Sequence, residues 1–587
     1  MLAKLFKCGI GGQRSDRSVG RFTVGSSRRS RSKSAKLRLE SLEPRLVLTG
    51  VVLNEFVASN GSVFVDEDGD GSDWIELYNG STESVDLGGW FLTDNASNLT
   101  KWEIPAVELE AGGYLVIFAS SKNRVNVGGE LHTNFSLSTD GEYLALVGPD
   151  GTSIATEYAP SFPTQYRDIS YGIADVFVDD VFVGQEFRYF LTPTPGGANG
   201  EGVVGFAPVV EASVSRGFYD DPFLLELTTA SVDATIYYTY DGSIPSADNP
   251  AATLYQDPIV INRTTVFRAA SYLDAHGRSP VTTHTYIFLE DVLTQTIDRT
   301  NPANNPFGLA YPTLQGVAGD YNMSPAIVAT WDDFNPSNND FGIRESLLAL
   351  PTMSIVMDHE DLWNSTTGIY PNALQRGLDW RRAGSIEYFG AADGNSFQEN
   401  AGVQIHGNGS RHPDQPKNSF RLIFNPDFEG PGRLDFPLFD HSDFADINTV
   451  VLRGMNQDNI AVKTAADRMS SMTSTNMRNQ WNLETFRAMG QLASEFTYVH
   501  LYVNGLYWGL FEATERIDEA SLSSRLGGNP EDWDVIVPVR GDVTGSDAAW
   551  NAMFALARQI PSNSPSTANA IYHQLQGLNP DGTRNED

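Results

Sequence analysis

Short runs in which hydrophobic and polar residues alternate make up most of the first half of the chain. This period of two sends successive side chains to opposite faces and is typical of β-strands. Between residues 50 and 198 the runs are separated by turn pairs such as Asn79-Gly80 and Gly112-Gly113. The spacing predicts an all-β module of the sandwich type. Its strands are expected at 51–57, 74–78, 90–93, 114–118 and 143–147.

A second stretch of alternation, residues 207–289, follows the turn-rich sequence Pro-Thr-Pro-Gly-Gly-Ala-Asn-Gly at 193–200. We predict that this sequence is a linker and that a second all-β sandwich follows it, with a turn at Asp241-Gly242. Residues 290–345 are predicted to be a further linker. The strands of the second sandwich are expected at 235–240, 264–271 and 283–288.

The pattern changes from residue 346 onward, where strands occur between longer segments of helical periodicity. The Asn504-Gly505 pair lies between two alternating runs and predicts a β-hairpin. Helices are predicted at about 465–490, ending at Gly490, and within 549–576. Residues 346–587 are therefore predicted to form an α+β domain with an antiparallel sheet. Its strands are expected at 401–406, 419–424, 449–453, 498–503 and 506–511.

Composition narrows the class of protein. Hydrophobic residues make up 41% and aromatic residues 11%, which is enough for several cores. No run approaches the roughly 18 apolar residues that a membrane-spanning helix needs, so no integral membrane segment is expected. The single cysteine, Cys8, excludes a disulfide framework and a cysteine nucleophile after the N-terminal segment. The formal net charge of −34 repels phosphate backbones, so nucleic acid is not an expected partner.

The N-terminal segment, residues 1–48, has the opposite charge. Up to residue 45 it holds twelve Lys and Arg but only three acidic residues, and its composition is typical of a disordered basic tail. Residues 37–48, Leu-Arg-Leu-Glu-Ser-Leu-Glu-Pro-Arg-Leu-Val-Leu, resemble the LEPR-XLL segment near the start of exported planctomycete proteins. The resemblance implies an extracellular or cell-surface protein.

Both β modules resemble families of accessory domains. The order LNEF, DWIELYN, DLGGWFLTD, AGGYLVIFAS and FSLSTDGEYLALVGPDG in residues 50–198 resembles a lamin tail domain, an immunoglobulin-like sandwich. The sequence IYYTYDGSIPS with LYQDPIVINRTTVFRAASY in residues 207–289 resembles the C-terminal sandwich of chitobiase and β-hexosaminidase enzymes. These resemblances imply binding or spacing, and they carry no catalytic residues.

An acidic loop in the first module raises the question of a metal site. Asp66, Asp68 and Asp70 with Gly71 match positions 1, 3, 5 and 6 of an EF-hand loop, where carboxylate oxygens hold Ca²⁺. Position 12 is Leu77 rather than a glutamate, and flanking helices are not expected. The three aspartates are therefore candidate Ca²⁺ ligands, and a solvated acidic hairpin tip is the alternative.

Three ordered segments in the C-terminal domain, at 402–424, 499–518 and 526–536, resemble the CotH family. They read GVQIHGNGSRHPDQPKNSFRLIF, VHLYVNGLYWGLFEATERID and LGGNPEDWDVI. CotH proteins are spore-coat-type proteins with an atypical protein-kinase fold. The resemblance implies binding of ATP and Mg²⁺ and phosphorylation of secreted or surface proteins.

The resemblance also nominates nucleotide-binding residues. Phosphoryl transfer needs cations beside the nucleotide phosphates. Lys417 follows the Gly-rich turn at 407–411 and has the place of a nucleotide-contacting lysine, with Arg411 and Arg421 as further candidates. Glu515 lies just after the predicted hairpin, where the family has its nucleotide-side hinge. Without the resemblance, Lys417 reads as a surface lysine after a loop.

The carboxylates that would hold Mg²⁺ are not identified. In CotH-like kinases they lie beyond the hinge and the helices after it, and Asp518, Asp532 and Asp534 are too close to the hinge. The last ten residues read as a polar loop, so the kinase-like domain is expected to be incomplete at its C-terminus.

Two functions stay open at this point. The first is an exported multidomain protein with a CotH-type kinase. The second is a non-catalytic surface, adhesion or polysaccharide-binding protein with a truncated kinase-like relic. The chain has no zincin His pair, no Gly-x-Ser-x-Gly elbow and no Walker phosphate loop.

Overall fold

The computed structural model describes residues 50–584, except 62–63, 127, 179–180, 296–322, 331–341, 412–416, 426–427, 440–445, 455–474, 530–531 and 538–541. The basic N-terminal segment, with its LEPR-XLL resemblance, lies outside the described residues. Within the described part of the chain, no helix is long and apolar enough to cross a membrane.

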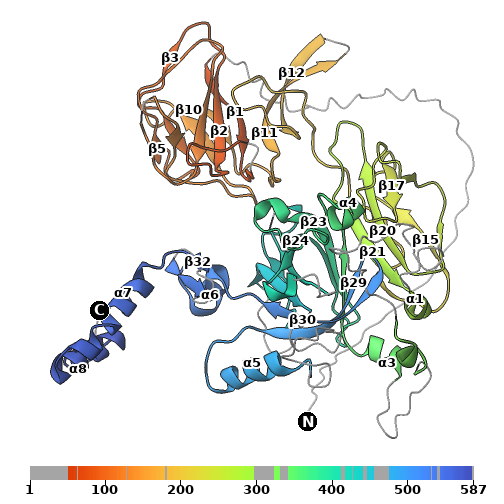
Figure 1. Cartoon of the computed structure of the whole chain (residues 1–587). Helices are drawn as coiled ribbons and strands as arrows, with labels where there is room; N and C mark the ends of the chain where they lie inside the picture. Colours follow the sequence, from red (N-terminus) through yellow and green to blue (C-terminus); the bar gives the residue numbers. More distant parts are fainter. Residues whose placement is uncertain are drawn as a thin grey trace, which may run out of the picture. The chain divides into compact units, whose positions relative to one another are not determined.

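The first module is a sandwich of two sheets, as its alternation predicts (Figure 1). Side chains such as Ile75, Leu92, Ile117 and Leu144 are fully buried and form one core. The larger sheet has the order β12-β11-β1-β2-β7-β8 and the smaller one β10-β9-β4-β5. The strands are β1 (Val51–Val57), β2 (Asp73–Asn79), β4 (Phe91–Thr93), β5 (Trp102–Glu103), β7 (Tyr114–Ala119), β8 (Leu131–His132), β9 (Leu144–Val147), β10 (Ile154–Tyr158), β11 (Ser170–Val178) and β12 (Val181–Phe190), with a small pair β3 (Val85–Asp86) and β6 (Glu108–Leu109).

The segment predicted to be the first linker is instead bound to this sandwich. Glu55 on β1 lies opposite Glu76 on β2, and both side chains are fully buried. The backbone N–H of Thr194 donates to Glu55 Oε1 at 3.1 Å, and that of Gly196 donates to Glu76 Oε2 at 2.5 Å. Buried carboxylates need hydrogen-bond donors, and a period-two pattern gives no sign of where they come from.

These buried carboxyl groups make the module sensitive to pH. Burial raises the pKa of Glu76 to about 7 and that of Asp73 to about 6. Because the folded state holds these protons more tightly than the unfolded chain, stability is full at low pH and falls as pH rises from about 4 to 7. The pKa of Glu76 rises from 4.5 to about 7, so at about 1.4 kcal/mol per pKa unit this residue contributes at most about 3.5 kcal/mol to the change.

We expect urea unfolding of the chain to show a lower midpoint at pH 8 than at pH 5. Glu76→Gln is uncharged at both values, so it should match the wild type at pH 5 and exceed it at pH 8. A wild-type midpoint that rises toward pH 8 would contradict the assignment.

The second module is also built from strands around one core. Leu225, Phe267 and Tyr286 are fully buried in it. Its main sheet has the order β14-β21-β20-β17-β18, and two strand pairs, β15-β19 and β13-β16, complete the module. The strands are β13 (Glu211–Ala212), β14 (Gly217–Phe218), β15 (Phe223–Leu225), β16 (Leu227–Thr228), β17 (Thr235–Thr239), β18 (Thr253–Leu254), β19 (Ile259–Ile261), β20 (Thr265–Tyr272) and β21 (Thr282–Ile287).

Strand β21 is hydrogen-bonded to the C-terminal domain. Glu387 of that domain is fully buried, accepts the backbone N–H of Thr285 at 3.0 Å, and pairs with Arg216 at 3.2 Å. The predicted linker at 290–345 contains helices in its described parts. They are α1 (Leu289–Thr294), α2 (Pro325–Val328) and the start of α3 (Ile343–Leu348).

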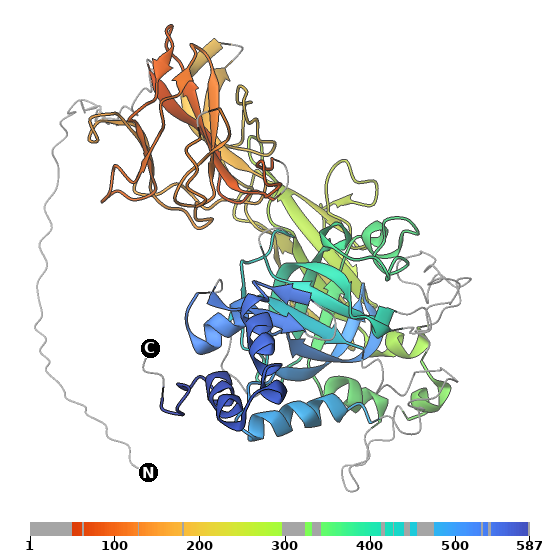
Figure 2. The ribbon, with the colours of Figure 1, turned by 60° about the vertical axis from the view of Figure 1, so that its left-hand side comes forward.

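The sheet of the C-terminal domain is a closed seven-stranded barrel (Figure 2). Neighbouring strands in the barrel are antiparallel, except that β22 and β29 pair in parallel and close the barrel. Closure was not predicted, because a hairpin pattern does not reveal which distant strands meet. The strands in barrel order are β22 (Thr352–Val356), β23 (Arg382–Phe389), β24 (Phe397–His406), β25 (Ser419–Ile423), β28 (Thr449–Arg453), β30 (Leu506–Glu515) and β29 (Phe496–Val503).

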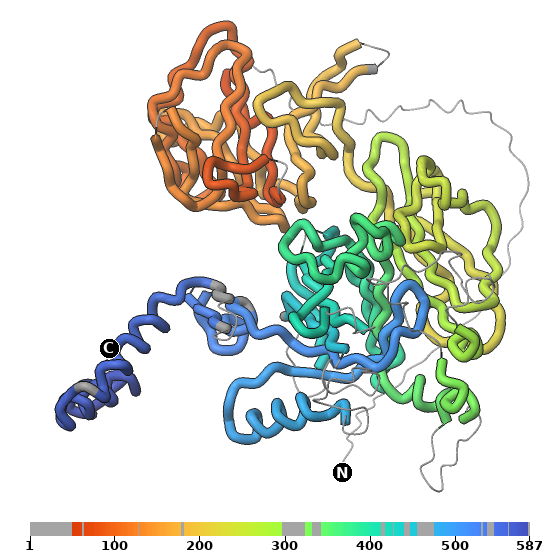
Figure 3. Tube along the Cα trace, viewed as in Figure 1, coloured from red at the N-terminus to blue at the C-terminus, as the bar shows by residue number. Residues whose placement is uncertain are grey.

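Local signals in this domain are confirmed. The β29–β30 hairpin, mid-blue in Figure 3, turns at Asn504 and Gly505, which both have positive φ. Helix α5 covers only part of the predicted 465–490, and Gly490 follows its end with φ +77°. The remaining elements are α4 (His359–Trp363), α6 (Glu519–Leu526), α7 (Ala548–Ala557), α8 (Pro565–Leu575), the pairs β26 (Leu434–Asp435) with β27 (Asp446–Ile447) and β31 (Val535–Val537) with β32 (Asp542–Thr544), and α5 itself (Arg478–Ala488).

Candidate functional site

A cavity of about 430 Å³ lies on the outside of the barrel. Alternation explains its position: Phe420, Leu452 and Ala513 point into the barrel core, so their neighbours face outward. The Gly-rich turn after β24 and the segment after β30 enclose the space. The lining residues are His406, Gly407, Asn408, Gly409, Ser410, Ser419, Val451, Arg453, Ser494, Thr514, Glu515, Arg516 and Ile517.

The Gly-rich turn is held in one conformation by backbone geometry and side-chain donors. Gly407 has φ +96°, a region that favours glycine. A Cβ there would lie 2.1 Å from Ser410 Oγ, which donates to the His406 carbonyl at 2.7 Å. Asn418 donates to the Ser410 carbonyl from the base of β25. The turn is therefore a fixed wall of the cavity.

Gly407→Ala is expected to lower the free energy of unfolding by about 1–3 kcal/mol, because a side chain must adopt the left-handed conformation and displace Ser410. Chemical denaturation of the purified chain measures the loss. Gly432→Ala is the matched control, since nothing lies within 4 Å of a Cβ there and its φ is not positive. Equal stability of the two variants would show that the turn tolerates a Cβ.

The structure places the Arg411 guanidinium among backbone carbonyls, and a phosphate contact of this residue stays a prediction. Its guanidinium is buried and donates to the backbone carbonyls of Gly407 at 2.7 Å, Ala373 at 2.7 Å, Gln375 at 2.6 Å and Ile405. Burial lowers the pKa of Arg411 to about 10. With these carbonyls as its partners, the side chain holds the turn against the preceding loop.

Glu515, which the sequence analysis placed near the hinge, lines the cavity. Its carboxylate is already paired. Arg525 on α6 donates to both of its oxygens, with Nε at 3.1 Å from Oε1. The backbone N–H of Glu495 donates to Oε2 at 3.1 Å. Arg487 on α5 binds Glu495 at 2.6 Å and extends the network. Burial raises the pKa of Glu515. This network joins α5, α6 and the barrel beside the cavity.

Arg421 belongs to a cluster of cations next to the cavity. Burial, and then repulsion from Arg516 and Arg381, lowers the pKa of Arg421 to about 9. Its Nε is buried and has no hydrogen-bond partner among the described residues. Arg516 itself lines the cavity. The nearby carboxylates of Asp518 and Glu519 offset part of this repulsion. Of the three arginines only Arg516 lines the cavity, where its guanidinium is suited to contact a phosphate.

Lys417 is not one of the residues that line this cavity. Its ammonium lies 4.2 Å from the ring centroid of Trp508, a core residue that is 1% exposed. This geometry is a cation–π contact. Lys417 is thus neither a free surface lysine nor a member of the cavity wall.

Two cationic residues of the cavity, Arg453 and Arg516, were missed from the sequence. Arg453 ends β28, and its Nη1 lies 3.9 Å from Glu512 Oε1. The signal was present in part, since Arg516 directly follows Glu515. Arg453 could be found only through the pairing of β28 with β25 and β30, which brings its outward face to the Gly-rich turn.

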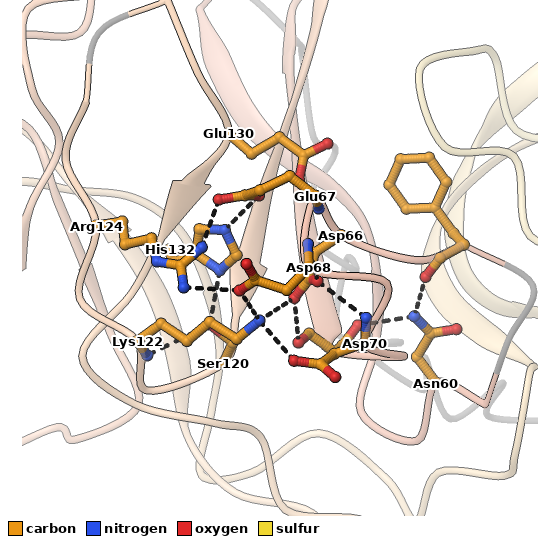
Figure 4. A network of polar contacts seen from close by, with 12 residues as sticks. Asn60, Asp66, Glu67, Asp68, Asp70, Ser120, Lys122, Arg124, Glu130 and His132 are labelled. Atoms are coloured by element: carbon orange, nitrogen blue, oxygen red, sulfur yellow. Dashed lines mark hydrogen bonds and ion pairs between the residues drawn. The ribbon is translucent and has the colours of Figure 1, made fainter.

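The acidic loop of the first module brings Asp66, Asp68 and Asp70 together, as the hypothesis of an EF-hand-like site requires. The ammonium of Lys122 lies among them, at 2.6, 2.7 and 2.8 Å from their Oδ2 atoms (Figure 4). Hydrogen bonds from Lys122 and Ser72 and from backbone N–H groups, against the opposing effect of burial, lower the pKa of Asp66 to about 2. Ca²⁺ would have to displace this ammonium, and calcium binding stays a prediction.

The fold and the cavity define a strand-rich multidomain protein with a cavity of small-molecule size on its last domain. Comparison with protein families is more specific. Residues 49–160 match the Lamin Tail Domain model, residues 225–286 the model described as Fn3 associated, and residues 403–567 the model described as CotH kinase protein. No curated protein matches the chain.

The chain therefore carries a lamin tail domain, an Fn3-associated domain and a CotH kinase domain, in that order. The lamin tail and CotH resemblances are confirmed. The second module matches Fn3 associated, whereas its sequence resembled the chitobiase sandwich.

Proposed function

We propose that the cavity binds a nucleoside triphosphate with Mg²⁺, and that the CotH kinase domain phosphorylates hydroxyl groups of secreted or surface proteins. In this reaction the acceptor oxygen forms a bond to the γ-phosphorus while the bond to the bridging oxygen of ADP breaks. The acceptor proton passes to a base. A carboxylate is the usual base in such reactions.

One observation carries the proposal: the Gly-rich turn and the segment after β30 enclose one cavity beside Arg453 and Arg516. Its volume falls in the range of small-molecule sites, about 300–1,000 Å³. The repulsion within the arginine cluster is relieved when a polyphosphate binds. Mg²⁺ would reach the site with the nucleotide.

Calorimetric titration of the purified chain with Mg·ATP tests binding, and transfer of label from the γ-phosphate tests the reaction. Lys417→Ala separates two locations for the nucleotide. If the phosphates lie against the arginines, this variant is expected to keep most of the affinity, because its ammonium contacts Trp508 instead. Loss of all binding in Lys417→Ala, with binding retained in Arg516→Ala, would move the site to the lysine and contradict the cavity assignment.

A second function, binding of a surface partner or polysaccharide without catalysis, is favoured by a separate observation. Among the described residues that line the cavity, Glu515 is the only one with a carboxylate, and Arg525 binds both of its oxygens. Among the described residues, the lining therefore offers no free carboxylate to hold Mg²⁺ or to serve as the base. Binding of nucleotide without transfer of label would support this second function. Export to the cell surface is part of both proposals, and the acidic composition is consistent with it.

A further inference from the structure

A second group of polar side chains lies beside the aspartate loop of the first module. Glu67, Glu130 and His132 bring one ligand atom each to within 4.8 Å of one another (Figure 4). They come from two places in the sequence, the loop before β2 and the region of β8. The imidazole of His132 is fully buried, and it stacks on Phe118 with 5.3 Å between ring centroids.

The imidazole is oriented toward the carboxylates. Its Nδ1 lies 2.8 Å from Ser120 Oγ, and its Nε2 lies 2.9 Å from Glu67 Oε2. The hydroxyl thus fixes one ring nitrogen while the other faces the acidic pair. Metal-binding histidines are held in this way by an outer hydrogen bond.

The two glutamates lie against each other. The backbone N–H of Glu67 donates to Glu130 Oε2 at 2.6 Å, and one carboxylate oxygen of each residue lies within 4.8 Å of the other. Two carboxylates in contact need a proton or a cation between them.

The net charge of the whole network also favours a bound cation. Five carboxylates face two cationic side chains, which leaves a formal charge of −3. Lys122 and Arg124 contact four of the acids, and Glu130 has no ion-pair partner among the described residues. The carboxylates are those of Asp66, Glu67, Asp68, Asp70 and Glu130.

We propose that Glu67, Glu130 and His132 bind a transition-metal cation, with Zn²⁺ as the best fit. One imidazole nitrogen and two carboxylate oxygens are Zn²⁺ ligands, and water would take the fourth position. Ca²⁺ prefers oxygen ligands alone, so the nitrogen separates this site from the aspartate loop. Zn²⁺ bonds of about 2.0–2.1 Å set ligand atoms roughly 3.3 Å apart in a tetrahedron, so the 2.9 Å pair needs only a small opening. The ion would fasten the loop before β2 to β8.

Calorimetric titration of the full, chelator-treated chain with Zn²⁺ tests the site, with metal analysis after dialysis. We expect one equivalent at this site. Glu130→Gln removes an exposed ligand and is expected to weaken binding more than 10-fold. Ser120→Ala is expected to weaken it 10- to 100-fold while all three ligands stay present. Asp70→Asn, in the neighbouring aspartate group, is the matched control and should bind Zn²⁺ as the wild type does.

Because His132 is fully buried, the exposed Glu130 carries the test, and the thermal midpoint of each metal-free variant verifies folding. Absence of Zn²⁺ binding, or equal affinity in wild type and Glu130→Gln, would overturn the proposal. So would loss of Zn²⁺ binding in Asp70→Asn alone, since the ion would then lie in the aspartate loop. Ca²⁺ titrated in parallel should not compete with Zn²⁺.

Discussion

Arg516→Ala is expected to weaken binding of Mg·ATP about 10- to 100-fold. The side chain lines the cavity and lies close enough to Arg421 to lower its pKa, so it presents positive charge where the proposal places phosphate. A hydrogen bond to a charged group contributes about 1.5–3 kcal/mol, which corresponds to this loss of affinity. Isothermal titration of wild type and variant measures it directly.

The same substitution has a second readout that distinguishes binding from folding. Removing Arg516 relieves repulsion on Arg421, so the thermal midpoint of the unliganded protein should stay the same or rise. Arg558→Ala, at an exposed position after α7, is the matched control and should change neither quantity. Wild-type affinity in Arg516→Ala would show that the phosphates do not bind at this wall.

Arg411→Ala is expected to lower the free energy of unfolding of the barrel domain by about 3–5 kcal/mol. Four backbone carbonyls lose their donor, and a buried acceptor without a partner costs about 1–3 kcal/mol. Arg411→Lys should rescue little, since a single ammonium cannot reproduce the planar fork of the guanidinium. Urea unfolding followed by tryptophan fluorescence provides the measurement.

Arg376 supplies the control for this experiment. It is exposed, and within the described part of the chain its one hydrogen bond is to Asn408 of the same turn, at 2.9 Å. Arg376→Ala is expected to change stability by less than about 0.5 kcal/mol. If Arg411→Ala kept wild-type stability and lost only nucleotide affinity, Arg411 would be the phosphate ligand that the sequence suggested.

Arg411 and Arg516 show why the sequence could nominate a site without assigning roles to its residues. The Gly-rich turn and the hinge glutamate were found because family motifs lie on them, and the fold brings both to one cavity. Arg411 and Arg516 are both single cations beside a motif. Arg411 is surrounded by backbone carbonyls, which indicates a structural role. Arg516 lies near other arginines, which makes it a candidate phosphate contact.

Metal chemistry shows the same division. The aspartate loop was visible in the sequence because its three acids are spaced two apart. Lys122, which lies among the three aspartates, comes from the segment after β7, and His132, which faces Glu67 and Glu130, comes from β8, both about sixty residues away. The pairing of β2, β7 and β8 within the larger sheet decides which cations and which imidazole reach the loop.

The sequence by itself determined the β-rich class, the order of three domains and the β29–β30 hairpin, because alternation and Asn-Gly turns act between near neighbours. Tertiary structure decided the binding of residues 194–196 to buried glutamates, the closure of the barrel through β22 and β29, and the position of the cavity on its outer face. Each of these depends on residues far apart in the chain. Their contacts follow from burial and from hydrogen bonds that buried polar groups require, and local periodicity does not encode which partners meet.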